Sequence, residues 1–151
     1  MLEGAGHLEL GGLSLEVEEL GPGESSLGTL WWLDREVAFA GDVAYDGMHA
    51  YLADGHWEQW LAALDRLEGT LPANVTLYVG HGPAGGKELF GRQHRYIEAL
   101  VAAVADNADA IGAGDHSAVV TAMKSVLPTD DVWFLMELSI EPVHAALTGR
   151  A

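Results

Sequence analysis

The chain has 151 residues, 49% of them hydrophobic and five of them tryptophan, and its 23 acidic and 7 basic side chains give a formal net charge of -16. A chain of this length buries roughly 70% of its unfolded surface when it folds, so the composition excludes a disordered protein. An excess of acid repels phosphate backbones and anionic lipid head groups, and we therefore expect no nucleic-acid partner and no membrane partner.

Cysteine is absent, which excludes disulfide bonds and thiolate metal sites. No apolar run reaches the length of a membrane-spanning helix, and the first residues lack the basic and apolar regions of a signal peptide. We therefore expect a cytoplasmic protein. Internal repeats, low-complexity segments and linkers are also missing, so residues 1–151 are expected to form a single domain.

The first part of the chain is predicted to form strands. Residues 7–20 alternate with period two around Gly11-Gly12, a pair suited to a tight hairpin turn. A turn-rich loop over residues 21–26 precedes a second pair of strands over residues 29–33 and 37–40. These two strands are continuous apolar runs rather than alternating ones, so both faces of this sheet are predicted to be covered.

The rest of the chain is predicted to be mainly helical. Tryptophan and leucine recur at helical spacing over about residues 56–67, and a strand over residues 75–79 follows. A long helix is expected over about residues 87–107, another near 117–126 and a last one over about 130–147. Thr129-Asp-Asp131 offers side chains that can cap the start of the last helix.

Two of these strands end in the same way, with a glycine followed by a side chain that can bind a metal ion. The first is Val37-Ala-Phe-Ala-Gly-Asp42 and the second is Val75-Thr-Leu-Tyr-Val-Gly-His81. Taken alone, Asp42 is typical of a turn or a helix cap, and His81 is typical of a tight turn between glycines. Taken together, across one helical crossover, they favour two metal ligands held by rigid strand ends.

In this order the chain resembles the C-terminal half of the metallo-β-lactamase superfamily of metallohydrolases. The resemblance rests on the loop Gly21-Pro-Gly-Glu-Ser-Ser26, on residues 31–42 with Phe-Ala-Gly-Asp, on Tyr78-Val-Gly-His-Gly-Pro83, and on the helix through Gln93 and Tyr96. It implies an α/β fold, namely one half of an αββα sandwich, with a mixed sheet, helices packed on one face and a helical C-terminal region.

The resemblance also implies a metal centre, in which Asp42 bridges two metal ions and His81 is a terminal ligand. The ion would be zinc, with iron or manganese as alternatives, and its activated water would hydrolyse an ester, lactone or amide bond of a small-molecule substrate. The chain departs from the family in lacking the main ligand cluster, a His-x-His-x-Asp-His run. It also carries Glu24 where the family usually has a histidine.

Two further residues are candidate ligands. Glu24 offers a carboxylate that zinc, manganese or iron accepts, although a solvated or capping role is more typical of such a residue than a ligand role. His49 follows Asp42 by seven residues, so it is a candidate ligand or a group that orients Asp42, with a place on the loop surface or in a pocket wall as the alternative.

Half of a sandwich leaves an apolar sheet face open, and such faces usually mark an interface. We therefore expect a homodimer or a partner chain that completes the sandwich. On this interpretation the chain is a metal-dependent hydrolase once further ligands come from that partner. The alternatives are a non-catalytic scaffold or oligomerisation module derived from the fold, and a metal-free protein that binds a small molecule near residues 41–49.

Overall fold

The structure is a computed structural model and describes residues 6–149. One five-stranded sheet has the order β1-β2-β3-β4-β5. The strands are β1 (Gly6–Leu10), β2 (Leu13–Gly21), β3 (Gly28–Leu33), β4 (Val37–Tyr45) and β5 (Thr76–His81). Neighbours from β1 to β4 are antiparallel, whereas β4 and β5 are parallel, so the sheet is mixed as predicted.

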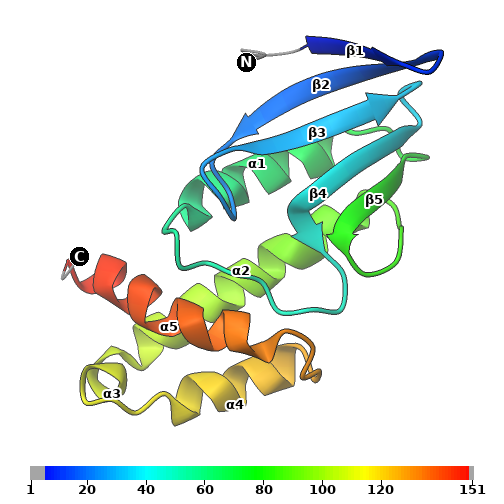
Figure 1. The fold of residues 1–151 in the computed structure, drawn as a ribbon. Helices are drawn as coiled ribbons and strands as arrows, with labels where there is room; N and C mark the ends of the chain where they lie inside the picture. The colour runs from blue at the N-terminus through cyan, green and yellow to red at the C-terminus, as the bar shows by residue number, and fades with distance from the viewer. Residues whose placement is uncertain (1–5, 150–151) are drawn as a thin grey trace.

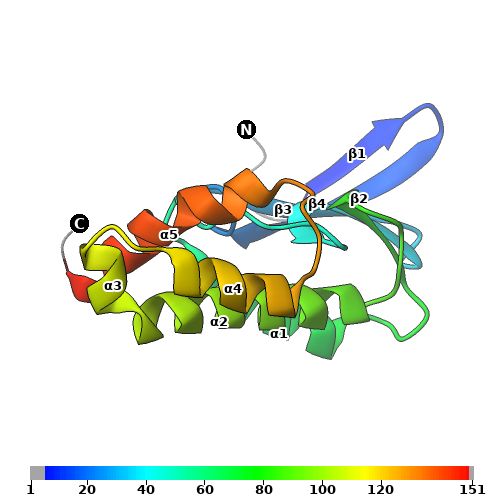
Figure 2. The same ribbon diagram turned by 90° about the horizontal axis from the view of Figure 1, so that it is seen from below.

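Five helices complete the fold: α1 (Trp57–Thr70), α2 (Glu88–Asp106), α3 (Ala108–Gly112), α4 (Ser117–Val126) and α5 (Trp133–Thr148). Figures 1 and 2 show α1 and α2 beneath one face of the sheet, with α3, α4 and α5 gathered against α2 as a helical C-terminal region. This arrangement confirms the predicted fold class. None of the helices in the described chain is long and apolar enough to cross a membrane.

The turn between β1 and β2 confirms the predicted hairpin. Gly11 and Gly12 have φ of 59° and 88°, and positive φ at both central residues is the mark of the primed turns that match strand twist. The turn between β3 and β4 also contains positive φ, at Asp34 (54°) and Arg35 (60°). The sequence has no glycine at this second turn that would predict it.

The two faces of the sheet differ in what covers them. Trp32, Ala38 and Leu77 are aligned across β3, β4 and β5, and all three are buried against the helices. The next row, Trp31 with Phe39 and Tyr78, points the other way. We call this side, together with Leu33 and Val37, the open face.

The open face is apolar, uncharged and partly exposed to solvent. Phe39 is 43% exposed and Tyr78 is 48% exposed, and their rings stack with centroids 5.3 Å apart. Within the described chain the helices cover the opposite face, so the prediction that both faces are covered is wrong for this chain taken alone. The reason is that β3 and β4 carry apolar side chains on both faces of the sheet. Helices of the described chain cover only one of these faces.

Helix α1 is held under the sheet by its tryptophans and leucines. Trp60 is 1% exposed, and its Nε1 donates a hydrogen bond of 2.8 Å to the carbonyl oxygen of Val43. Trp57, Leu64 and Leu67 are buried beside it, which confirms the predicted helical stripe as core. Because Trp60 bonds to β4 just beyond Asp42, it fixes the height of that strand end over the helix.

The last helix begins later than predicted. Helix α5 starts at Trp133, and Val132 before it has φ of 50° in the left-handed region. The Thr129 hydroxyl accepts a hydrogen bond from the Asp131 N–H (3.2 Å), and no side chain caps the helix itself. The expected cap of the last helix is therefore wrong, because Thr129 stabilises the turn that precedes the helix.

Candidate functional site

The carboxyl ends of β4 and β5 meet at one edge of the sheet because the two strands are parallel. Gly41 has φ of 51°, and the pairing between the strands shifts on both sides of it. This irregularity turns the end of β4 so that Asp42 faces the end of β5. His81 is the last residue of β5 and pairs with Tyr45.

Asp42 and His81 are brought together at this edge. The Asp42 Oδ1 and the His81 Nε2 lie 3.5 Å apart, and about half of each side chain is exposed. Two donors bound to one tetrahedral zinc at 2.0–2.1 Å are separated by about 3.3 Å. The observed separation is thus long for a hydrogen bond and close to that expected of two ligands on one metal ion.

Gly80 makes this approach possible. A Cβ atom at Gly80 would overlap the Asp42 Oδ1 and would lie 2.9 Å from the carbonyl carbon of Gly41, inside the closest distance that real Cβ atoms adopt. Any larger residue at this position would therefore push the carboxylate away from the end of β5. The glycine before His81 is therefore required by packing across the strands.

Tyr45 contacts two of the predicted ligands, His81 and Glu24. Its ring stacks on the His81 ring with centroids 5.1 Å apart and an interplanar angle of 16°, and its hydroxyl donates a hydrogen bond to the Glu24 carboxylate. The Asp46 N–H donates to the His81 carbonyl oxygen (2.9 Å), which fixes the backbone of that histidine. Tyr45 is 3% exposed, so the stack is anchored in the core.

Glu24 lies in the same neighbourhood and is partly buried. Burial is the main cause that raises the pKa of its carboxyl above the ordinary value of 4.5; the Tyr45 hydrogen bond opposes this shift and the Asp42 charge adds to it. Burial and the Glu24 carboxylate in turn raise the pKa of the Tyr45 phenol, so that this hydroxyl stays protonated and donates. Glu24 is therefore a carboxyl that takes up a proton readily beside Asp42.

His49 is placed elsewhere, in a buried network under the C-terminal helices. Its Nε2 lies 3.1 Å from the carbonyl oxygen of Thr129, and its Nδ1 lies 2.9 Å from the Tyr96 hydroxyl. A carbonyl accepts only, so Nε2 carries the proton and Nδ1 accepts from Tyr96. Burial lowers the pKa of His49, which keeps the ring neutral. Both nitrogens already have partners in the fold, and neither partner is Asp42.

The four predicted residues thus do not form one complete metal site. Within residues 6–149, no three His, Asp or Glu side chains are grouped so that they could hold a metal ion. A catalytic zinc normally has three protein ligands, so the side chains of residues 6–149 do not by themselves fit a complete centre and we assign no reaction step to a metal here. What the chain holds is a pair, Asp42 and His81, with Glu24 close by.

A cavity of about 390 Å³ includes Asp42 of the pair in its lining and extends from the open face to Trp60 and Ala63 of α1. Glu24 and Asp42 line its polar end, and Trp31, Phe39 and Leu27 line its apolar part. Tyr45 is not among the site residues that the sequence predicts. The position of Tyr45 in β4 gives no sign in the sequence that its side chain would contact both Glu24 and His81, which are distant from it in the chain.

Comparisons with known proteins find similarity in structure. No protein-family model and no curated protein matches the chain. A metallo-β-lactamase family protein from Thermus thermophilus is 18% identical with a TM-score of 0.66, and the match covers 99% of this chain and 48% of that chain. A metallo-β-lactamase from Pontibacter korlensis is 23% identical with a TM-score of 0.57, covering 64% of this chain and 47% of that one.

A third solved structure, the inverting sec-alkylsulfatase Pisa1 from Pseudomonas sp., is 15% identical with a TM-score of 0.59, and the match covers 100% of this chain and 26% of that chain. This chain therefore spans about half the length of the two metallo-β-lactamase structures and about a quarter of the alkylsulfatase. The likeness is one of fold, and it confirms the resemblance found in the sequence. The chain therefore has the fold of about one half of the metallo-β-lactamase structures that it matches.

Proposed function

We propose that the chain supplies one half of a metal-dependent hydrolytic centre, with Asp42 and His81 as two of its ligands. The observation that carries the proposal is the 3.5 Å separation of the Asp42 Oδ1 and the His81 Nε2 at the meeting point of two parallel strand ends. The requirement for Gly80 supports it, since the packing of the strands is built around that separation.

A second unit supplies the remaining ligands in this proposal. We call the pair Asp42 and His81 the half-site. The open face supports a second unit, because Phe39 and Tyr78 expose an apolar, uncharged surface next to the half-site, and surfaces of this kind mark interfaces. The unit is a second copy of the chain or a partner that completes the sandwich. The completed centre would hold zinc, iron or manganese and would hydrolyse an ester, lactone or amide bond of a small molecule, as the fold of the solved relatives suggests.

One observation favours a different function. The described residues hold two ligands where a catalytic centre needs three. This is what a non-catalytic scaffold or oligomerisation module would show if it had kept the fold and lost the chemistry.

Metal binding separates the two candidate functions. The chain is purified without chelator, and zinc binding is measured by calorimetry for the wild type and for the Asp42→Ala and His81→Ala variants. Each variant is expected to weaken zinc binding at least about tenfold, because each removes one of two ligands. His116→Ala is the matched control, since His116 also faces a carboxylate, that of Glu141, at 2.7 Å.

Zinc binding that is equal in the wild type and in both ligand variants would contradict the proposal that Asp42 and His81 are metal ligands. It would favour the non-catalytic scaffold. Sedimentation at equilibrium tests the second unit separately. A wild-type chain that stays monomeric at high concentration, with and without zinc, would rule out a second copy and require a different partner.

A further inference from the structure

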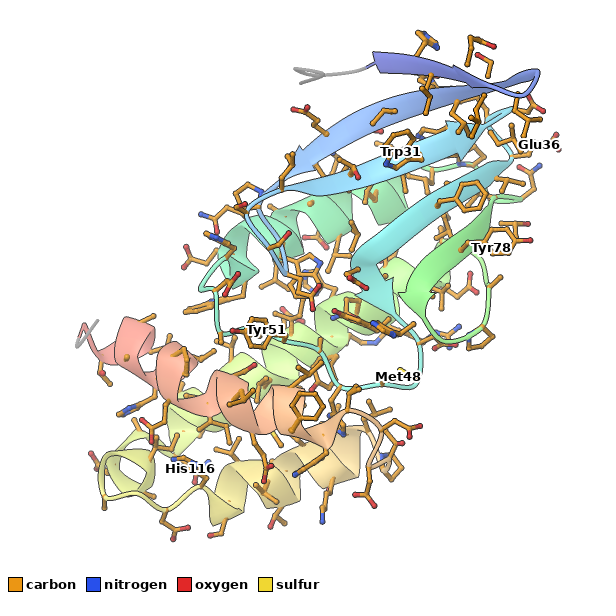
Figure 3. All side chains as sticks on the ribbon, viewed as in Figure 1. Trp31, Glu36, Met48, Tyr51, Tyr78 and His116 are labelled. Atoms are coloured by element: carbon orange, nitrogen blue, oxygen red, sulfur yellow. The ribbon has the colours of Figure 1, made fainter. Side chains whose placement is uncertain are left out.

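A second cavity, of about 310 Å³, lies beyond the carboxyl end of β4. Its walls come from three parts of the chain: the segment that follows β4, the middle of α2 and the end of α4. Met48, which Figure 3 labels on that segment, lies in the first wall, and Leu127 lies in the third. Tyr96 of α2 adds an aromatic surface, so most of the cavity is apolar.

The charge of this cavity is opposite in sign to that of the chain. Arg92 and Arg95 line it together with a single carboxylate, that of Asp46, although the chain has a net charge of -16. The cavity beside Asp42 has two carboxylates and no basic residue in its lining. The small cavity near α3 is likewise lined by one carboxylate and no Lys or Arg.

The two arginines differ in how they are used within the fold. Arg92 forms ion pairs with Asp46 at 2.8 Å and with Glu88 at 3.6 Å, so its charge is offset locally. Arg95 is exposed, and in the described part of the chain no carboxylate lies within ion-pair distance of it. Arg95 therefore offers an uncompensated positive charge at the cavity wall.

Gln93, between the two arginines, supplies a buried polar group in the same wall. The side chain is 3% exposed, and its Oε1 accepts a hydrogen bond of 3.1 Å from the Tyr45 N–H. Its Nε2 has no hydrogen-bond partner among residues 6–149. Buried donors are nearly always paired, so this unpaired N–H, which is closed off from solvent, leaves a partial positive charge behind the cavity wall.

We propose that this cavity binds a small carboxylate with a compact apolar body. The carboxylate lies against the Arg95 guanidinium, with the partial positive charge of the Gln93 amide behind the wall, and the body lies against Met48, Tyr96 and Leu127. The arginine fork matches the two oxygens of a carboxylate, and the apolar lining selects for a body such as a phenyl or branched alkyl group. The proposal does not depend on a metal ion at the pair Asp42 and His81.

A structural role for Arg95 is the competing explanation. Helix α4 ends at Val126, beside the cavity, and a cation near a helix C-terminus is favoured by the partial negative charge there. In that case Arg95 would stabilise the chain and contribute nothing to ligand binding. The two explanations differ in whether affinity or stability changes when Arg95 is replaced.

The experiment is a titration of the ¹⁵N-labelled full chain, followed by NMR, with three probes that share a phenyl group. Phenylacetate carries the negative charge, 2-phenylethanol is neutral and 2-phenylethylamine is positive. Phenylacetate is expected to give saturable shifts centred on the amides of Gly47, Met48 and Leu127, and the other two probes are expected to bind at least about tenfold more weakly, since a charge-assisted hydrogen bond contributes that much.

Arg95→Ala is expected to weaken phenylacetate binding about tenfold on the same argument. Arg66→Ala is the control, because it removes the same charge from α1 and is expected to change the affinity less than about twofold. Gln93→Glu keeps the acceptor for the Tyr45 N–H and replaces the free donor by a negative charge, so it is expected to weaken binding as well. This variant decides the matter if Arg95→Ala does not fold.

Three results would overturn the proposal. The first is a positive or neutral probe that binds as tightly as phenylacetate. The second is an Arg95→Ala variant with a lower melting temperature and unchanged affinity, which would make Arg95 a helix-end residue. The third is a set of shifts centred on the open face, which would place the phenyl group against Trp31 and Phe39 instead.

Discussion

Replacing Gly80 by alanine tests the construction of the half-site without removing either ligand. The new Cβ would lie 2.9 Å from the carbonyl carbon of Gly41, where ordinary contact begins at 3.4 Å. The ends of β4 and β5 must therefore separate by about 0.5 Å, and overpacking of this kind costs about 1–3 kcal/mol. The Asp42 carboxylate is displaced at the same time, since the Cβ would occupy the place of its Oδ1.

Two measurements follow the substitution. Urea unfolding monitored by circular dichroism should show the loss of about 1–3 kcal/mol. Zinc calorimetry should show an affinity lower by about 10- to 100-fold, as for other changes that misplace a ligand.

Gly69→Ala is the matched control. A Cβ at Gly69, inside α1, would meet nothing within 4 Å, so this variant is expected to gain about 0.5–1 kcal/mol from helix propensity. A Gly80→Ala chain with the stability and zinc affinity of the wild type would refute the argument that the strand ends are packed around the separation of Asp42 and His81.

Two further predictions concern stability. The pKa of Glu24 is raised above 4.5 in the folded chain. As the pH rises from 4.5 through the pKa of the folded chain, the unfolded chain therefore releases a proton that the folded chain keeps. The free energy of unfolding falls over this pH range. Glu24→Gln should gain stability over the wild type as the pH rises above 4.5, and a pH-independent difference in urea titrations would contradict this. Tyr96→Phe removes the hydroxyl that donates to the His49 Nδ1 and should cost about 1–3 kcal/mol, with a loss under about 0.5 kcal/mol in thermal unfolding counting against the network.

Much of the fold could be predicted because it depends on residues that are close together in the sequence. The paired glycines at residues 11 and 12 predict the first turn, and the tryptophan and leucine spacing predicts α1 within a few residues. Helix α4 begins and ends at the predicted residues, Ser117 and Val126, and it stops before Pro128, which cannot continue a helix. The adjacent Trp31 and Trp32 must point to opposite faces of a strand, and the structure buries Trp32 and leaves Trp31 on the open face.

The parts of the site that depend on distant contacts could not be predicted in the same way. The link between Glu24 and Tyr45 joins a loop to the end of β4 through a side-chain contact that no spacing reveals. His49 is near Asp42 in the chain, but the segment between β4 and α1 leads it under α5, where the edge of its ring meets Trp133 at a centroid distance of 4.7 Å. The left-handed conformation of Val132 likewise has no signal in the sequence, because β-branched residues rarely adopt positive φ. The roles of Asp42, His81, Glu24 and His49 at a metal ion stay predictions.

The order of the strands has a consequence for how the half-site assembles. The antiparallel strands β1 to β4 are joined by short connections, whereas β4 and β5 meet through a connection that contains all of α1. Closing a long loop costs more chain entropy than closing a short turn, so we expect the parallel pairing to form after the local ones. Asp42 lies on β4 and His81 lies on β5, so the pair depends on the parallel pairing of these two strands. A local opening between β4 and β5 would separate the two residues while the antiparallel strands stay folded.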